Sequence, residues 1–204
     1  MSKYFSVLDT WYSLFDLIVV DACKPKFFSE GTTLKVLEDC VEGCNIYSGG
    51  NHDQLTSMLE TQGHKILYCG DHLHADIIKC RKMTSWKTIL IVPELNYELK
   101  NNAQDGLLSH IAKLENLLAN NPKLTDVKSR LHEAVTEYDQ RFSKCGSLFR
   151  SGTKLSYFGS MVKTWSEVYT SSVGNIAGYC LDTNFIPNHN KLAHEEEESM
   201  EMQK

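Results

Sequence analysis

Hydrophobic positions divide the chain into a first part with short apolar runs and a second part with helical periodicity. Runs at 15–22, 65–69 and 87–92 have the length and composition of buried strands. A helix is predicted from about residue 76 to 84, between the last two runs, which gives a strand, helix and strand unit with parallel pairing. Residues 31–47 predict a short hairpin around Gly43, and a further helix begins within Asp53 to Leu59.

The second part, from about residue 100, carries three apolar stripes at helical spacing. The first two are separated by Asn120-Asn121-Pro122 and predict an antiparallel helical hairpin. Stripes of this kind belong to the core more often than to a partner surface. They consist of Leu107, Leu108, Ile111, Leu114, Leu117 and Leu118; of Leu124, Val127, Leu131, Val135, Tyr138 and Phe142; and of Leu155, Phe158, Val162, Trp165 and Tyr169.

Candidate chemistry is concentrated after the 65–69 run, where Gly70 ends the strand and Asp71 and Asp76 follow five positions apart. Carboxylates at the carboxyl end of a parallel strand suit Mg²⁺, which binds one or two of them and keeps its other sites for water and phosphate. The spacing alone allows an equally good alternative, in which Asp71 fills an Asx turn and Asp76 caps the next helix. The residues around this segment are therefore needed to decide.

Several blocks, in register, resemble the cytosolic purine 5'-nucleotidases of the haloacid dehalogenase superfamily. The blocks are Phe15–Asp21 with Lys24–Phe28, Ile46–Gly50, Gly70–Asp76, Trp86–Thr88, Val92–Leu95 and Gly146–Gly152, and they cover most of residues 11 to 170. The resemblance implies an α/β fold with a partial haloacid-dehalogenase-like Rossmannoid sheet, lacking its first strands, followed by a helical C-terminal region. The expected domains are an α/β core at 1–100, a helical region packing on it at 101–180, and an acidic, disordered tail at 181–204.

The resemblance also implies an activity, which is hydrolysis of purine nucleoside 5'-monophosphates, IMP and GMP, through an aspartyl-phosphate with Mg²⁺. Lys24 matches the catalytic lysine, whose ammonium neutralises negative charge as phosphate reacts. Asp71 matches the metal ligand, and Asp76 matches the second acidic position, which helps hold the ion and its waters. His74 and Lys82 fall where relatives bind a nucleotide effector, and similar enzymes form homo-oligomers.

One family motif is absent. The superfamily attacks phosphate with the first aspartate of a D-x-D motif, and no D-x-D occurs in these 204 residues. The chain is therefore expected to be the C-terminal part of a nucleotidase. The alternative is a catalytically inactive, truncated homologue that acts as an interaction or oligomerisation module.

Net charge, hydropathy and cysteine content bear on the partners and the cellular location of the protein. The net charge of −5 argues against nucleic-acid binding, and no apolar run approaches the ~20 residues that span a bilayer. Seven cysteines, an odd number without a regular framework, fit free thiols in the cytoplasm. Zinc sites could be assembled from Cys40, Cys44 and His52, or from Cys69, His72, His74 and Cys80, but neither set has the short paired spacings of a structural zinc site.

Overall fold

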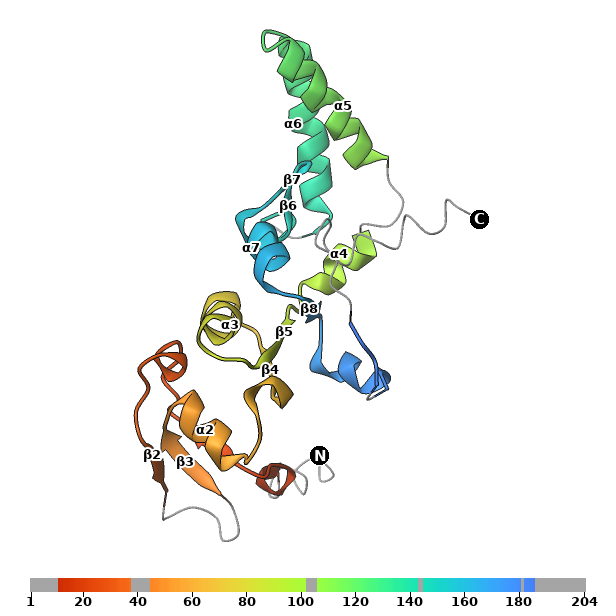
Figure 1. Cartoon of the computed structure of the whole chain (residues 1–204). Coiled ribbons are helices and arrows are strands. Elements are labelled where there is room, and N and C mark those ends of the chain that lie inside the picture. Colours follow the sequence, from red (N-terminus) through yellow and green to blue (C-terminus); the bar gives the residue numbers. More distant parts are fainter. Residues whose placement is uncertain (1–10, 38–44, 102–105, 143–144, 181, 186–204) are drawn as a thin grey trace, which may run out of the picture. The chain divides into compact units, whose positions relative to one another are not determined.

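A computed structural model describes residues 11–37, 45–101, 106–142, 145–180 and 182–185 (Figure 1). The chain divides into two compact units, Met1–Thr88 and Ile89–Lys204. Short sheets and helices occur in both, which confirms the predicted α/β class. No helix in the described ranges is long and apolar enough to cross a membrane. Most of the predicted acidic tail lies outside the described residues.

A three-stranded sheet forms the first part of the first unit. Strand β1 (Ile18–Val20) pairs in parallel with β3 (Ile46–Gly49), and β2 (Leu34–Val36) pairs antiparallel with the other edge of β3. The strand predicted at 15–22 and the hairpin predicted at 31–47 are thus confirmed, although the turn around Gly43 lies outside the described residues. Strand β1 is shorter than predicted: a 3₁₀ turn, η1 (Trp11–Leu14), comes before it, and Asp21 directly after it has a φ of 54°, which is outside the range of a strand.

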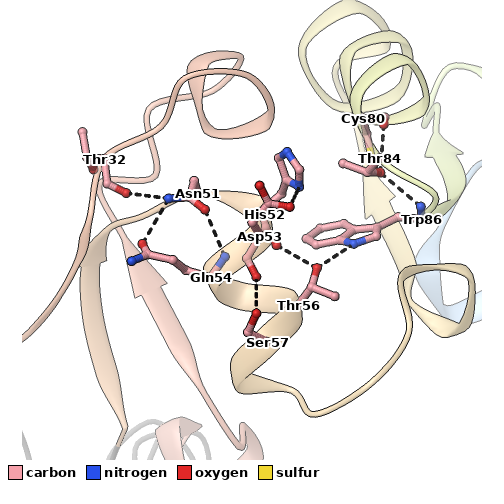
Figure 2. A network of polar contacts seen from close by, with 10 residues as sticks. All are labelled: Thr32, Asn51, His52, Asp53, Gln54, Thr56, Ser57, Cys80, Thr84 and Trp86. Carbon is pink, nitrogen blue, oxygen red and sulfur yellow. Dashed lines mark hydrogen bonds and ion pairs between the residues drawn. The ribbon is translucent and has the colours of Figure 1, made fainter.

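Polar contacts hold helix α2 (His52–Met58) at its start and at Thr56, as Figure 2 shows. At its start, Oδ1 of Asn51 accepts the Gln54 N–H at 3.0 Å, while Nδ2 of Asn51 donates to the Thr32 carbonyl at 3.0 Å. Further along the helix, the Trp86 indole N–H donates to Oγ1 of Thr56 at 3.1 Å. These bonds join α2 to the hairpin on one side and to the segment before β5 (Lys87–Ile91) on the other.

The strand predicted at 65–69 forms as β4 (Leu67–Gly70), after the 3₁₀ turn η3 (Gly63–Lys65). The prediction that this strand is buried is wrong for one of its two faces. Leu67 is 51% exposed and Cys69 is also exposed, whereas Tyr68 is half-buried and Gly70 is buried. Side chains alternate along a strand, so only the face with Tyr68 and Gly70 is covered.

The core of the first unit lies against this covered face. Phe27 and Phe28, from the 3₁₀ turn η2 (Lys26–Phe28), pack with Cys80 and Trp86, and the partly buried Tyr68 joins them. The Phe28 ring stands edge-on to those of Tyr68 and Trp86, with centroids 5.3 and 6.0 Å apart. Edge-to-face aromatic pairs of this kind add to the stability gained by burial.

The helical segment after β4 begins earlier than predicted and in an unusual form. A π-helical turn, η4 (Leu73–Ile78), leads into α3 (Lys79–Met83), where the sequence predicted a helix from about 76 to 84. The N–H of Lys79 donates to the carbonyl of His74, five residues back, as a π-turn requires. Such turns are rare and occur often at functional sites.

The first helix of the second unit is α4 (Leu95–Asn101), which the sequence pattern did not predict, and two long helices follow it. Helices α5 (Leu107–Asn120) and α6 (Thr125–Gln140) lie side by side and confirm the predicted helical hairpin (Figure 1). The buried residues between them are Ile111, Leu114, Ala134, Tyr138 and Phe142.

The third predicted stripe is only partly helical. Leu155 lies in β7 (Lys154–Leu155), which pairs with β6 (Arg150–Ser151), and Tyr169 lies in β8 (Val168–Thr170), parallel to β5. Between them, α7 (Tyr157–Trp165) has Ser156 as its N-cap, whose Oγ accepts the Gly159 N–H. This cap sets the helix start after Leu155. The last described element is the 3₁₀ turn η5 (Val173–Gly178).

The block at 146–152 folds around a buried carboxylate from α4. Glu98 is 3% exposed, and its Oε1 accepts the Ser147 hydroxyl at 2.8 Å and the Leu148 N–H at 3.0 Å. Burial raises the pKa of Glu98, and the hydrogen bonds only partly oppose that shift.

We expect Phe28→Ala to lower the free energy of unfolding by about 3–5 kcal/mol, because the ring is fully buried and its removal leaves a cavity. Phe15→Ala is the matched control, since that ring is 55% exposed. Urea denaturation of both variants makes the comparison. Equal losses would contradict the core described for the first unit.

Candidate functional site

Lys24 is held in place by the buried residues that follow it. It comes after β1, and Phe27 and Phe28 anchor the next turn in the core of the first unit. The Phe27 N–H donates to the Cys23 carbonyl at 3.0 Å, which closes the backbone around Lys24. The Lys24 side chain itself remains 43% exposed. Its ammonium is therefore positioned by the fold and still open to solvent.

Asp76 lies in the π-helical turn with its side chain only 1% exposed. Gly70 makes room for it, because a Cβ at that position would stand 2.4 Å from the Asp76 Cβ. The glycine of the G-D-x-x-x-x-D segment is therefore needed for packing, in addition to any chemical role of the two aspartates. A side chain at the end of β4 would displace the carboxylate from the place it occupies.

Lys24, Tyr68 and Asp76 form one hydrogen-bonded group. The Lys24 Nζ lies 2.8 Å from Oδ1 of Asp76, and the Tyr68 hydroxyl donates to the same oxygen at 2.9 Å. Lys24 also donates to the Tyr68 hydroxyl at 3.3 Å. The second carboxylate oxygen, Oδ2, accepts the backbone N–H of His72 at 3.1 Å. Both oxygens of Asp76 therefore have partners.

These contacts set the charge states of the group. Burial alone would raise the pKa of Asp76, but the bonds from Lys24, Tyr68 and the His72 N–H outweigh it and the pKa lies below its ordinary value. Burial likewise acts to lower the pKa of Lys24, and the bonds to Asp76 and Tyr68 raise it overall. Burial and the bond to Asp76 raise the pKa of Tyr68 to about 12. At neutral pH the group is an ammonium, a carboxylate and a neutral phenol.

The other predicted site residues are exposed and do not join this group. Asp71 lies in the turn between β4 and the π-helical turn, His74 lies on that turn, and Lys82 lies on α3. The structure thus brings together Lys24 and Asp76 from the predicted set and leaves the Asp71 carboxylate in solvent. The proposed roles of Asp71, His74 and Lys82 stay predictions.

The fit of this region to Mg²⁺ rests on its carboxylates. Mg²⁺ takes one or two carboxylates together with waters and substrate phosphate, and the exposed Asp71 meets that need. Asp76 offers less, because its side chain is only 1% exposed and its oxygens already bind Lys24, Tyr68 and the His72 N–H. Within the described ranges, no group of three or more His, Cys, Asp or Glu residues is placed to hold a metal. Of the two predicted metal ligands, only Asp71 therefore has an exposed carboxylate.

Tyr68 is the member of the group that sequence reasoning missed. A signal was present, because Tyr68 stands two positions before Gly70 and therefore on the same face of β4. A residue on that face must point toward whatever Gly70 makes room for. The backbone N–H of His72 could not have been found this way, since it depends on the path of the turn.

The geometry is that of an α/β protein in which a partly exposed lysine, paired with a buried carboxylate, follows a strand. Residues 2–197 match the model of the 5' nucleotidase family, and the chain belongs to that family. The predicted resemblance to the 5'-nucleotidases is thus confirmed.

Three relatives show how much of such proteins the chain represents. A 5'-nucleotidase domain-containing protein of Dictyostelium discoideum is 28% identical over 211 residues, 92% of this chain and 36% of that protein. The 5'-nucleotidase domain-containing protein 2 of Rattus norvegicus and of Homo sapiens are each 27% identical over 209 residues, 91% of this chain. The match covers 38% of the rat protein and 40% of the human one. The chain therefore spans less than half the length of these curated relatives.

We expect Gly70→Ala to lower the free energy of unfolding by about 1–3 kcal/mol, because the new methyl group overlaps the buried Asp76 side chain. Gly106→Ala is the control, since a Cβ there meets nothing within 4 Å. Chemical denaturation compares the two. A Gly70 variant as stable as the Gly106 variant would show that the carboxylate is not packed against β4.

Proposed function

We propose that the chain forms part of a 5'-nucleotidase that hydrolyses purine nucleoside 5'-monophosphates, IMP and GMP. The observation that carries the proposal is Lys24, an ammonium fixed by a buried carboxylate and yet 43% exposed. Membership of the 5'-nucleotidase family supports phosphate as its ligand. A positioned cation of this kind stabilises negative charge on a transferring phosphoryl group.

In this proposal the reaction is shared between this chain and sequence outside it. The nucleophile would be the first aspartate of a D-x-D motif elsewhere in the polypeptide, forming an aspartyl-phosphate that water then hydrolyses. Lys24 would bind the phosphoryl oxygens throughout and keep its proton, because the contact with Asp76 favours the ammonium. The short match to longer relatives supports this division.

We further propose that Asp71 is the direct ligand of Mg²⁺ and that Asp76 helps hold the ion's waters. The exposed position of Asp71 supports the first role. When bound, the ion would add positive charge beside the reacting phosphate. Asp76 would contribute by keeping Lys24 in place through Oδ1 and by accepting a water of the ion's shell at Oδ2, the oxygen that does not contact Lys24 or Tyr68.

The remaining parts of the proposal concern partners and location. His74 and Lys82, exposed on one helical segment, are the candidates for a nucleotide effector site, with the imidazole stacking on a base and the ammonium on phosphate. The full-length protein is proposed to form homo-oligomers. Free thiols at Cys23, Cys69, Cys80 and Cys180 support a reducing location, the cytoplasm.

The test uses the protein as isolated from its natural source and the same protein carrying single substitutions. We expect Mg²⁺-dependent phosphate release from IMP and GMP, and a fall in kcat of roughly 100- to 1,000-fold for Lys24→Gln, the loss expected when a charge-stabilising donor is removed. Lys26→Gln is the control, because that lysine is exposed two positions away.

Asp71→Asn separates the metal role from the lysine role in the same assay. We expect it to raise the Mg²⁺ concentration needed for half-maximal rate, while Lys24→Gln leaves that concentration unchanged. Full activity of the Lys24 variant, or a rate that is indifferent to Mg²⁺ removal by a chelator, would contradict the proposal.

A further inference from the structure

Tyr68 connects the two charged members of the site through one oxygen atom. Its hydroxyl donates to Oδ1 of Asp76 at 2.9 Å and accepts from the Lys24 ammonium at 3.3 Å. Asp76 and Lys24 also contact each other directly at 2.8 Å. The three polar groups therefore close a triangle, in which each side chain fixes the positions of the other two.

The aromatic ring holds that oxygen in place. Tyr68 stands edge-on to Phe28, with centroids 5.3 Å apart, and lies 6.0 Å from the Trp86 ring. Because the ring is packed in the core, the hydroxyl has little freedom to follow a moving lysine. Burial, together with the bond to Asp76, also raises the pKa of Tyr68 to about 12, so the hydroxyl remains a donor toward Asp76 at neutral pH.

The donors of Lys24 can then be counted. An ammonium has three N–H groups. One is directed to Asp76 and one to Tyr68, and no third partner for it occurs among the described residues. Since the side chain is 43% exposed, the third N–H can meet an anion in solvent without breaking the first two bonds.

We propose that Tyr68 is a positioning residue, which orients the Lys24 ammonium so that its third N–H is presented to a phosphoryl oxygen. The inference rests on the proposed function, because it assumes that Lys24 binds phosphate. Tyr68 need not touch the substrate in this arrangement. Tyr68 acts through Lys24. The Asp76 carboxylate supplies the negative charge that holds the ammonium, and the Tyr68 hydroxyl fixes the direction of its N–H groups.

The first experiment measures Lys24 itself and needs no activity. Competitive acylation followed by mass spectrometry gives the reactivity of each lysine against pH, with Lys26 as the internal reference. In Tyr68→Phe the ring and its packing stay, and only the hydroxyl is lost. We expect the Lys24 profile to move to lower pH, because the contact with Asp76 then opposes burial without help from Tyr68. The Lys26 profile should not move.

Tyr47→Phe is the matched control, a tyrosine on β3 in the same unit without a hydroxyl contact to Lys24 or Asp76. It should leave the Lys24 profile unchanged. A Lys24 profile that is also unchanged in Tyr68→Phe would overturn the positioning role, since a merely structural tyrosine has no reason to alter the titration of Lys24.

The second experiment measures binding of inorganic phosphate to the full chain by titration calorimetry. We expect Tyr68→Phe to weaken binding about two- to tenfold, the effect of one hydrogen bond acting through the lysine, and Tyr47→Phe to leave it unchanged. Unchanged binding in Tyr68→Phe would contradict the proposal. Absence of binding to the unmodified chain would contradict the proposed function, while the Lys24 titration still decides whether Tyr68 positions the lysine.

Discussion

Asp76 is a carboxylate with 1% of its side chain exposed, and an ionised group in such surroundings is stable only when a cation and hydrogen-bond donors replace water. Lys24 supplies the cation, and Tyr68 and the His72 N–H supply the remaining donors. The segments that carry these residues are far apart in the sequence, so the ion pair also ties the turn after β1 to the turn after β4. Removal of either charge leaves the other without its partner, which makes the pair a constraint on structure and chemistry together.

A second buried carboxylate, in the other unit, has a different set of partners. Glu98 is 3% exposed and accepts bonds from the Ser147 hydroxyl and the Leu148 N–H, and the positive charge of Arg150 also acts to lower its pKa. Burial raises the pKa of Glu98, whereas the pKa of Asp76 is lowered despite burial. The hydrogen bonds of Glu98 and the positive charge of Arg150 do not offset its burial, whereas the contacts of Asp76 with Lys24, Tyr68 and the His72 N–H outweigh burial. Glu98 fits a role in folding the 146–152 block, and Asp76 fits a role in holding charge ready for an anion.

Much of the fold could be predicted from hydrophobic periodicity, because α5 and α6 have long stripes and β5 has a buried apolar run. Hydrophobic periodicity did not predict the elements whose structure depends on contacts between residues far apart in the sequence. Helix α4 is short and depends on the contact of Glu98 with a loop about 50 residues away, and Tyr169 belongs to a strand because β8 pairs with β5. In the site, the lysine and the two aspartates were found from matching blocks. Tyr68 was not, because its role depends on three side chains that meet only after folding.

The ion pair predicts that Lys24 and Asp76 are energetically coupled, and a double-mutant cycle measures their coupling free energy. The four proteins are the unmodified chain, Lys24→Met, Asp76→Asn and the double variant, each unfolded by urea. We predict a coupling free energy of about 1–3 kcal/mol, with the double variant more stable than the sum of the single losses implies. Additive losses, with a coupling near zero, would show that the two groups do not depend on each other and would contradict the structural role of the ion pair.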